Sequence, residues 1–366
     1  MTRRLFEKYP RLRETLPWLE LADLPTRVHR LAALGKDAGL ADLWIKRDDE
    51  TSTLYGGNKP RKFEFLYAEA RALGKDEIVT CGGDGTNHGV AATLFARKLG
   101  MAATLVLSPQ PVLPYVRRNI AAYCACGAKV LHTSSTPAVL LRAGRYLAAC
   151  RIARGRAPYF MWFGGSSAVG AIGFVEAALE LAAQVAAGEM PCPKYIFVPV
   201  GSCGTQAGLE VGFRLAGLPT RLVGVAVVDR AVTNRHMVAR LANRAAKLLH
   251  DRCPDVPRVR VRASEVVVLH DYFGGQYGRP TPDGKAAMRR MMDVEGIALD
   301  PTYTGKTVAG LLDWTKKQGF ARETLLYWLT LNHRDLAALA PDDPDRANVP
   351  PVLRGYFTRP SVDPEL

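Results

Sequence analysis

The sequence predicts an α/β protein of two domains, each an open, twisted and mostly parallel sheet flanked by helices. A chain of 366 residues is too long for one ordinary hydrophobic core. Short apolar segments alternate with helical patterns, and strands joined by such helices form parallel βαβ units. A glycine-rich bend at residues 164–170 divides this alternation into two successive series.

The expected elements follow from the apolar patterns. In the first series we predict a strand that starts at Leu43, strands at 77–81, 103–107 and 129–132, and helices at 59–73, 87–99, 115–126 and 138–154. In the second series we predict strands at 195–200, 221–228, 266–269 and 325–329, a helix that closes near Gly217, and a basic edge strand at 258–262.

The domain boundaries follow from these two series. We expect residues 1–50 and 161–340 to form the larger domain and residues 51–160 the smaller one. Residues 341–366 form a tail rich in Pro and Asp, to which we assign no chemistry.

Composition limits the function classes. The formal charge is +14, but the arginines are dispersed and no nucleic-acid-binding motif accompanies them, so we predict no nucleic-acid partner. Seven cysteines without a CxxC pair indicate free thiols in a reducing compartment, and the scattered histidines predict no metal site. The start lacks an apolar signal region, and the apolar run at 168–188 contains Glu176 and Glu180. We therefore expect a cytoplasmic protein without a membrane span.

The stretch Tyr55-Gly-Gly-Asn-Lys-Pro-Arg-Lys62 is the most informative one. Pro60 belongs in the first turn of a helix, which puts Lys59 at the helix N-terminus behind two glycines. The partial positive charge of that helix end disfavours a protonated ammonium. A neutral lysine amine is nucleophilic and can form a Schiff base with an aldehyde cofactor. An exposed lysine beside a turn is the alternative interpretation.

Two further turns connect an apolar strand to a helix. Gly201-Ser-Cys-Gly-Thr205 would point several backbone N–H groups at one spot in front of a helix, which favours phosphate binding. In Cys81-Gly-Gly-Asp-Gly-Thr-Asn-His-Gly89 we predict Asn87 as the N-cap and Thr86 as a turn residue. Tight turns also use Gly and Ser without any ligand.

These motifs together resemble, in the same order along residues 24–339, the D-cysteine desulfhydrase and 1-aminocyclopropane-1-carboxylate deaminase family. The resemblance implies the tryptophan-synthase-β-like fold, fold type II of pyridoxal-phosphate enzymes, with the cofactor between the domains. Lys59 would then carry pyridoxal 5′-phosphate. Lys62 and the turn Gly201, Ser202, Cys203, Gly204 and Thr205 would hold its phosphate.

The resemblance also implies the other site residues. Asn87 would contact the cofactor ring oxygen, the amides around Thr86 and His88 the substrate carboxylate, and Thr86 the substrate. Tyr277 and Tyr303 would shuttle protons or orient the Thr86 hydroxyl. Thr304 follows the second tyrosine at a substrate-binding position, and Thr330 would face the pyridine nitrogen; both threonines favour the desulfhydrase type over the deaminase type.

Four positions depart from the family pattern: Gly85 replaces a Gln, Thr86 replaces a Ser but keeps a hydroxyl, and Leu331-Asn332 replace Gly-Gly. The resemblance implies a homodimeric carbon–sulfur lyase that performs α,β-elimination on a small amino acid, with D-cysteine as the leading case. The alternatives are a ring-opening deaminase, a relative that acts on another amino acid such as a sulfonated or anionic one, and a non-catalytic cofactor-binding protein.

Overall fold

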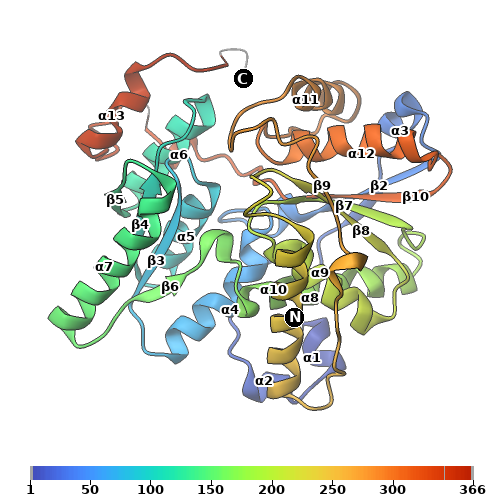
Figure 1. Ribbon diagram of the computed structural model, residues 1–366, viewed down its shortest axis with the longest axis horizontal. Helices are drawn as coiled ribbons and strands as arrows, with labels where there is room; N and C mark the ends of the chain where they lie inside the picture. Colours follow the sequence, from blue (N-terminus) through green and yellow to red (C-terminus); the bar gives the residue numbers. More distant parts are fainter. Residues whose placement is uncertain (1–2, 342, 364–366) are drawn as a thin grey trace. The chain divides into compact units, whose positions relative to one another are not determined.

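The computed structural model describes residues 3–341 and 343–363, and it divides into two compact units (Figure 1). The first unit combines the chain up to Phe65 with Ser166–His333. The second unit combines Leu66–Gly165 with the described residues from Arg334 onward. The α/β class with two mostly parallel sheets is confirmed.

The first unit contains a six-stranded sheet in the order β1-β2-β10-β7-β8-β9. Only the β1–β2 pair is antiparallel within this sheet. Its strands are β1 (Val28–Arg30), β2 (Asp42–Arg47), β7 (Tyr195–Val200), β8 (Arg221–Ala226), β9 (Val267–Leu269) and β10 (Thr324–Leu329). Its helices are α1 (Arg4–Lys8), α2 (Leu12–Thr15), α3 (Ala32–Ala38), the start of α4 (Lys59–Ala72), α8 (Ala168–Ala186), α9 (Gly204–Ala216), α10 (Arg235–Arg252), α11 (Pro282–Glu295) and α12 (Thr304–Gln318), with 3-10 turns η1 (Asp48–Glu50) and η3 (Ala263–Glu265).

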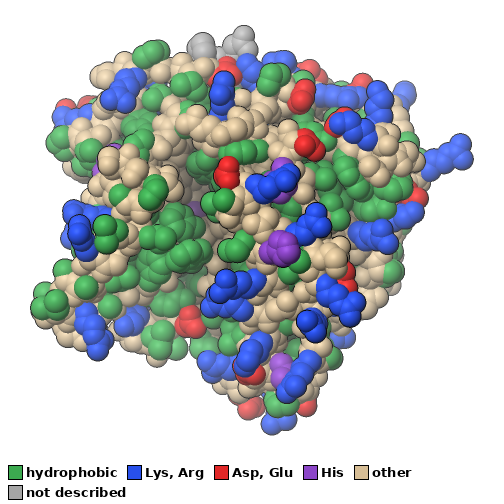
Figure 2. All heavy atoms as spheres, viewed as in Figure 1, with side chains coloured by type: hydrophobic (Ala, Val, Ile, Leu, Met, Phe, Trp, Pro, Cys, Tyr) green, Lys and Arg blue, Asp and Glu red, His purple; other side chains and the backbone are tan. Residues whose placement is uncertain are grey.

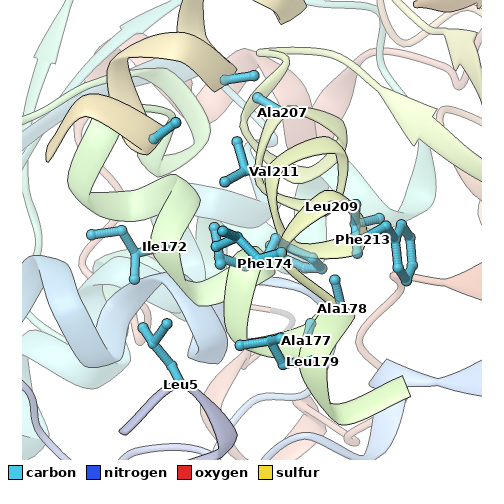
Figure 3. Packing of buried hydrophobic residues seen from close by; sticks show 14 of the residues in the cluster. Leu5, Ile172, Phe174, Ala177, Ala178, Leu179, Ala207, Leu209, Val211 and Phe213 are labelled. Carbon is cyan, nitrogen blue, oxygen red and sulfur yellow. The ribbon is translucent and has the colours of Figure 1, made fainter. Parts of the chain in front are cut away.

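Helices bury both faces of this sheet. Alternate residues of β7 point to opposite sides, so that Ile196 and Val198 join a core with α8, α9 and α10, whereas Phe197 joins a core with α3, α11 and α12. Figure 3 shows the first core, where side chains of α8 and α9 interdigitate. The two helices can approach closely because Gly208 of α9 has no side chain. A Cβ atom there would lie 2.2 Å from the carbonyl oxygen of Ala171.

The second unit contains a four-stranded parallel sheet in the order β5-β4-β3-β6. Its strands are β3 (Glu77–Gly83), β4 (Ala102–Ser108), β5 (Lys129–His132) and β6 (Tyr159–Met161). Its helices are the remainder of α4, α5 (Asn87–Lys98), α6 (Pro114–Ala125), α7 (Thr136–Arg154) and α13 (Pro351–Thr358), with 3-10 turns η2 (Phe163–Gly165) and η4 (Ala337–Leu339).

Several boundaries differ from the sequence-based expectation. The first unit extends through Phe65, because η1 and the loop before Lys59 lie against the ends of β2 and β10 rather than on the second sheet. The described tail is part of the second unit, where Arg117 of α6 donates to the carbonyl oxygen of Tyr356. Residues 258–262 form no strand, because Val261 exchanges its backbone hydrogen bonds with the Asn243 side chain of α10.

Helix α8 is the one helix in the described part of the chain that is long and apolar enough to cross a membrane. Its apolar window is 72% buried inside the protein, as expected for a core helix, so length and composition are weak evidence for a span. Glu180 of this helix lies within a buried ionic cluster described below.

Candidate active site

The loop before Lys59 lies directly on the carboxyl ends of two strands of the first unit. Gly56 N donates to Asn332 Oδ1 over 2.7 Å, and Asn58 N donates to the carbonyl oxygen of Thr330 over 3.2 Å. Gly57 has φ +84°, and a Cβ atom there would lie 2.6 Å from the Thr330 oxygen. Glycine is required because the loop passes so close to β10, and this contact fixes the start of α4.

Lys59 is the first residue of α4 and is partly buried. Burial lowers the pKa of its amine to about 8, against an opposing effect of the Asp300 carboxylate. Burial therefore acts in the same direction as the expected effect of the helix dipole. The amine is neutral in a substantial fraction of molecules near pH 8, as a nucleophile or base requires.

Asn58 links this amine to the turn after β7. Lys59 Nζ donates to Asn58 Oδ1 over 2.7 Å, and Asn58 Nδ2 donates to Thr205 Oγ1 over 3.1 Å. Two hydrogen bonds thus connect Lys59 to the predicted phosphate turn within the first unit.

The turn at residues 201–205 has the backbone geometry of an anion-binding cradle. Cys203 has φ +69°, which is rare for a non-glycine residue, and Gly204 opens α9. A left-handed residue before a helix N-terminus directs successive backbone N–H groups to one side, as in anion-binding nests. A Cβ atom on Gly204 would lie 2.4 Å from Ser166 Oγ and 3.0 Å from Lys62 Nζ, so a side chain there would fill the cradle.

Lys62 supplies a cation beside this cradle. Its Nζ donates to Ser166 Oγ over 3.3 Å, and Ser166 Oγ lies 2.7 Å from Ser202 Oγ and accepts from Gly204 N over 3.1 Å. Burial and the charge of Lys59 hold the pKa of Lys62 well below its usual value, against an opposing effect of Cys203. A bound anion would reverse this shift, because it stabilises the protonated amine.

A buried ionic cluster binds the first turn of α4 to η1 and α8. Arg61 is fully buried and donates to Asp48 of η1 and to Glu180 of α8. Lys46 also donates to Glu180 over 2.5 Å, and Trp328 Nε1 donates to Asp48 over 2.8 Å. Burial alone would raise the pKa of Glu180, but the charges of Arg61 and Lys46 lower it to about 2. The cluster orients α4 from several elements of the first unit.

The two predicted tyrosines meet in the first unit. Their hydroxyls lie 2.8 Å apart, and Tyr303 Cε1 lies 3.5 Å from the position of a Cβ atom on Gly201. Burial and the neighbouring Tyr303 raise the pKa of Tyr277 well above its usual value, so it keeps its proton. Thr304 is fully buried, and its Oγ1 donates to Asp300 Oδ2 over 2.6 Å.

The turn after β3 lies in the second unit. Its N-cap is Thr86 rather than the predicted Asn87, because Thr86 Oγ1 accepts from Gly89 N over 3.1 Å and Asn87 already belongs to α5. Asn87 Oδ1 instead accepts from Asn119 Nδ2 over 2.8 Å. His88 is buried, with Nε2 3.0 Å from Thr80 Oγ1.

The structure therefore groups the predicted residues in two sets. The first unit carries Lys59, Lys62, residues 201–205, Tyr277, Tyr303, Thr304 and Thr330; the second carries Thr86, Asn87 and His88. Asn58, Ser166 and Asp300 were not among the predicted site residues. Asn58 stands inside the lysine motif and Ser166 inside the glycine-rich bend, so both signals were present. Nothing local distinguished Asp300.

Comparison with known proteins decides the family. A family profile described as "Pyridoxal-phosphate dependent enzyme" matches residues 19–330. The chain belongs to this family. D-cysteine desulfhydrase from Yersinia enterocolitica is 36% identical over 312 residues, which cover 83% of this chain and 90% of the relative. D-cysteine desulfhydrase from Klebsiella pneumoniae is 34% identical over 313 residues, 84% of this chain and 91% of the relative.

Solved structures agree with this assignment to the pyridoxal-phosphate family. An ACC deaminase homologue aligns with TM-score 0.77 and 31% identity over 92% of this chain and 97% of its own. Threonine deaminase isoform 2 from Solanum lycopersicum aligns with TM-score 0.58 and 16% identity over 92% of this chain and 86% of its own, which supports the fold alone. The resemblance to the desulfhydrase and deaminase family and the fold type are confirmed.

The residues of the first unit fit the family's cofactor, and the prediction of pyridoxal phosphate is confirmed at the level of the family. Lys59 offers an amine with a lowered pKa for the aldehyde. The phosphate could be held by Lys62, Ser166, Ser202 and the amide of Gly204. Gly204 leaves room for it, because any side chain at this position would occupy the space between these groups.

Proposed function

We propose that this protein is a pyridoxal-phosphate-dependent carbon–sulfur lyase that performs α,β-elimination on a small amino acid, with D-cysteine as the leading substrate. The observation that carries the proposal is the hydrogen-bonded connection from the Lys59 amine through Asn58 to Thr205 in the phosphate turn. The substrate is suggested by the relatives named D-cysteine desulfhydrase. With D-cysteine, the reaction consumes water and gives pyruvate, ammonia and sulfide.

When bound, pyridoxal phosphate supplies an aldehyde for the amines and a ring that accepts electrons from the substrate α-carbon. Lys59 has two tasks in this proposal: it holds the aldehyde at rest and, as a free amine, takes the α-proton. A pKa of about 8 suits the second task, since a base works best when its pKa is near the working pH.

The paired tyrosines are the proposed proton relay. Tyr277 and Tyr303 share a hydrogen bond of 2.8 Å, and the raised pKa of Tyr277 keeps a proton available in that pair. In the proposal, Thr86 and the amides of Asn87 and His88 bind the substrate and its carboxylate. Thr330 offers no carboxylate to hold a proton on the ring nitrogen, which favours elimination over transamination or racemisation.

A ring-opening deaminase is the second candidate, because the ACC deaminase homologue aligns with TM-score 0.77. The residue after Tyr303 is Thr304, which has no acidic group and favours the desulfhydrase type. Its hydroxyl donates a hydrogen bond to Asp300. The desulfhydrase proposal is therefore preferred. Release of 2-oxobutanoate from 1-aminocyclopropane-1-carboxylate would favour the deaminase.

The finer parts of the proposal are a homodimer in the cytoplasm and, as an option, an anionic amino acid as the substrate. On the face seen in Figure 2, Lys and Arg side chains lie in several separate groups, some of them beside acidic side chains. A net positive protein attracts anionic substrates. Light scattering would test the dimer.

A substrate screen tests the proposed function. The cofactor-loaded enzyme is incubated with D- and L-amino acids that carry β-leaving groups, including cysteine and sulfonated analogues, and keto acid and sulfide are measured. Pyruvate and sulfide in equal amounts from D-cysteine are the expected result. If no amino acid changes the absorbance of the bound cofactor and none yields a keto acid, the result would instead indicate a non-catalytic cofactor-binding protein.

A further inference from the structure

The C-terminal segment lies outside the family profile, which ends at residue 330, yet it is fastened to the second unit. Arg117 of α6 donates to the carbonyl oxygens of Tyr356 and Arg359 over 2.9 and 2.5 Å. Val362 N donates to the carbonyl oxygen of Val112 over 2.9 Å. The segment is thus bonded to the loop before α6 and to α6 itself.

Tyr356 of α13 carries this attachment to the turn after β3. Its buried hydroxyl lies 2.8 Å from Asp84 Oδ2 and 2.9 Å from the carbonyl oxygen of Gln110, and it accepts from Gln110 N over 3.0 Å. The carboxylate is the stronger acceptor for the one hydroxyl proton, because hydrogen bonds to ionised groups are stronger than neutral ones. Asp84 immediately precedes Gly85 and Thr86.

Asp84 depends on this hydroxyl because it has few other partners. It is fully buried, its Oδ2 also lies 3.1 Å from His132 Nε2, and its Oδ1 has no hydrogen-bond partner among the described residues. Its backbone groups are bonded to Ser108 and to the Tyr123 hydroxyl. Burial raises the pKa of Asp84, and the hydrogen bond from Tyr356 and the neighbouring His132 oppose this shift. Without Tyr356, the buried carboxyl group would keep His132 as its one side-chain partner there, which is costly.

The turn is also packed tightly against residues next to the tail. A Cβ atom on Gly83 would lie 2.3 Å from Gln110 Oε1, and one on Gly85 would lie 2.6 Å from Val116 Cγ2. Gly85 therefore leaves the space that Gln110 and Val116 occupy. The position of the turn follows the position of residues 110–116, which the C-terminal segment holds in place.

We propose that Tyr356 is a positioning residue: through Asp84 and Gln110 it holds the turn at residues 83–87 in the conformation that binds the substrate. The proposal rests on the proposed function, in which Thr86 and the amides of Asn87 and His88 contact the substrate. Amides aimed at a carboxylate lose much of their effect when they are displaced by about an ångström.

The first test needs no catalysis. Amide hydrogen exchange of a peptide spanning residues 82–88 is compared between wild type, Tyr356→Phe and Tyr146→Phe. Tyr146 is a matched control, because its hydroxyl donates to Glu77 over 2.8 Å at the opposite end of β3. We expect exchange about tenfold faster in Tyr356→Phe, as for loss of one hydrogen bond to a charged group, and unchanged in Tyr146→Phe. Equal exchange in all three proteins would overturn the proposal.

The second test uses kinetics. Tyr356→Phe should raise KM for the substrate about tenfold, leave kcat within about twofold and keep the absorbance of the lysine-bound cofactor. An unchanged KM would overturn the proposal. If Tyr356→Phe fails to fold, Asp84→Ala, which removes the acceptor of the Tyr356 hydroxyl, should give the same exchange and KM pattern. If wild type converts no amino acid, the proposed function fails, whereas the exchange result still decides whether Tyr356 holds the turn.

Discussion

Replacement of Lys62 by Met should act in opposite directions on the protein with and without its cofactor. Lys62 Nζ lies 3.0 Å from the point where a Cβ atom on Gly204 would sit, within reach of an anion in that cradle. Hydrogen bonds to charged groups contribute roughly 1.5–3 kcal/mol. Loss of this cation should therefore raise the Kd for pyridoxal phosphate about 10- to 150-fold.

The cofactor-free protein should become more stable in the same variant. Burial and Lys59 depress the folded-state pKa of Lys62, so the folded state binds the proton less strongly than the unfolded chain does. Wild-type stability consequently falls as the pH drops below the unfolded pKa of about 10.5, and Met removes this penalty while it keeps most of the packing. Lys36→Met, at an exposed position of α3 in the same unit, is the matched control.

Cofactor titration by absorbance and urea unfolding of the cofactor-free protein would measure both effects. Weaker cofactor binding together with higher stability of the free protein at pH 7 is the expected pair. Unchanged cofactor affinity in Lys62→Met would refute the assignment of the phosphate cradle. Equal stability in wild type and variant would refute the argument from burial.

Three further predictions follow from the same geometry. Gly57→Ala should lower the free energy of unfolding by about 1–3 kcal/mol in denaturant unfolding, because it adds a Cβ atom 2.6 Å from the Thr330 oxygen at φ +84°. Gly39→Ala is the control, since its Cβ atom would meet nothing within 4 Å. Equal stability of the two variants would contradict the close-approach argument. Acetylation of Lys59 in the cofactor-free protein, followed by mass spectrometry, should rise around pH 8, whereas that of a lysine in an unstructured reference peptide should rise at about pH 10.4; coincident profiles would count against the lowered pKa. Arg61→Met should lower the free energy of unfolding by about 3–5 kcal/mol in thermal or urea unfolding, since it leaves Asp48 and Glu180 buried with fewer partners. A decrease below about 1 kcal/mol would show that the cluster does not fix α4.

The sequence was sufficient for the alternation of strands and helices, because period and turn residues are local properties. β5 and β7 have the predicted bounds, 129–132 and 195–200. The sequence was insufficient where contacts with distant segments determine the local backbone structure. Residues 258–262 alternate in charge like an edge strand, but Asn243 of α10 takes up the backbone groups of Val261, and nothing near 258 indicates this.

The same limit applied to the candidate site. Lys59 and the turn at 201–205 could be found because glycines, a lysine and a helix start stand together in the sequence. The role of Asp300 could not, since its effect on the pKa of Lys59 acts through space between residues that are far apart in the sequence. The contact of Tyr356 with Asp84 joins positions 272 residues apart, which local patterns cannot reveal.

Borohydride reduction of the cofactor-loaded protein, followed by peptide mass mapping, tests the central assignment most directly. Lys306 is the internal competitor, because its pKa is also lowered to about 8 by burial and it lies in the same unit. The structure predicts that the reduced cofactor is attached to the peptide at Lys59 and not to the one at Lys306. Attachment at Lys306 or at any other lysine would contradict the account.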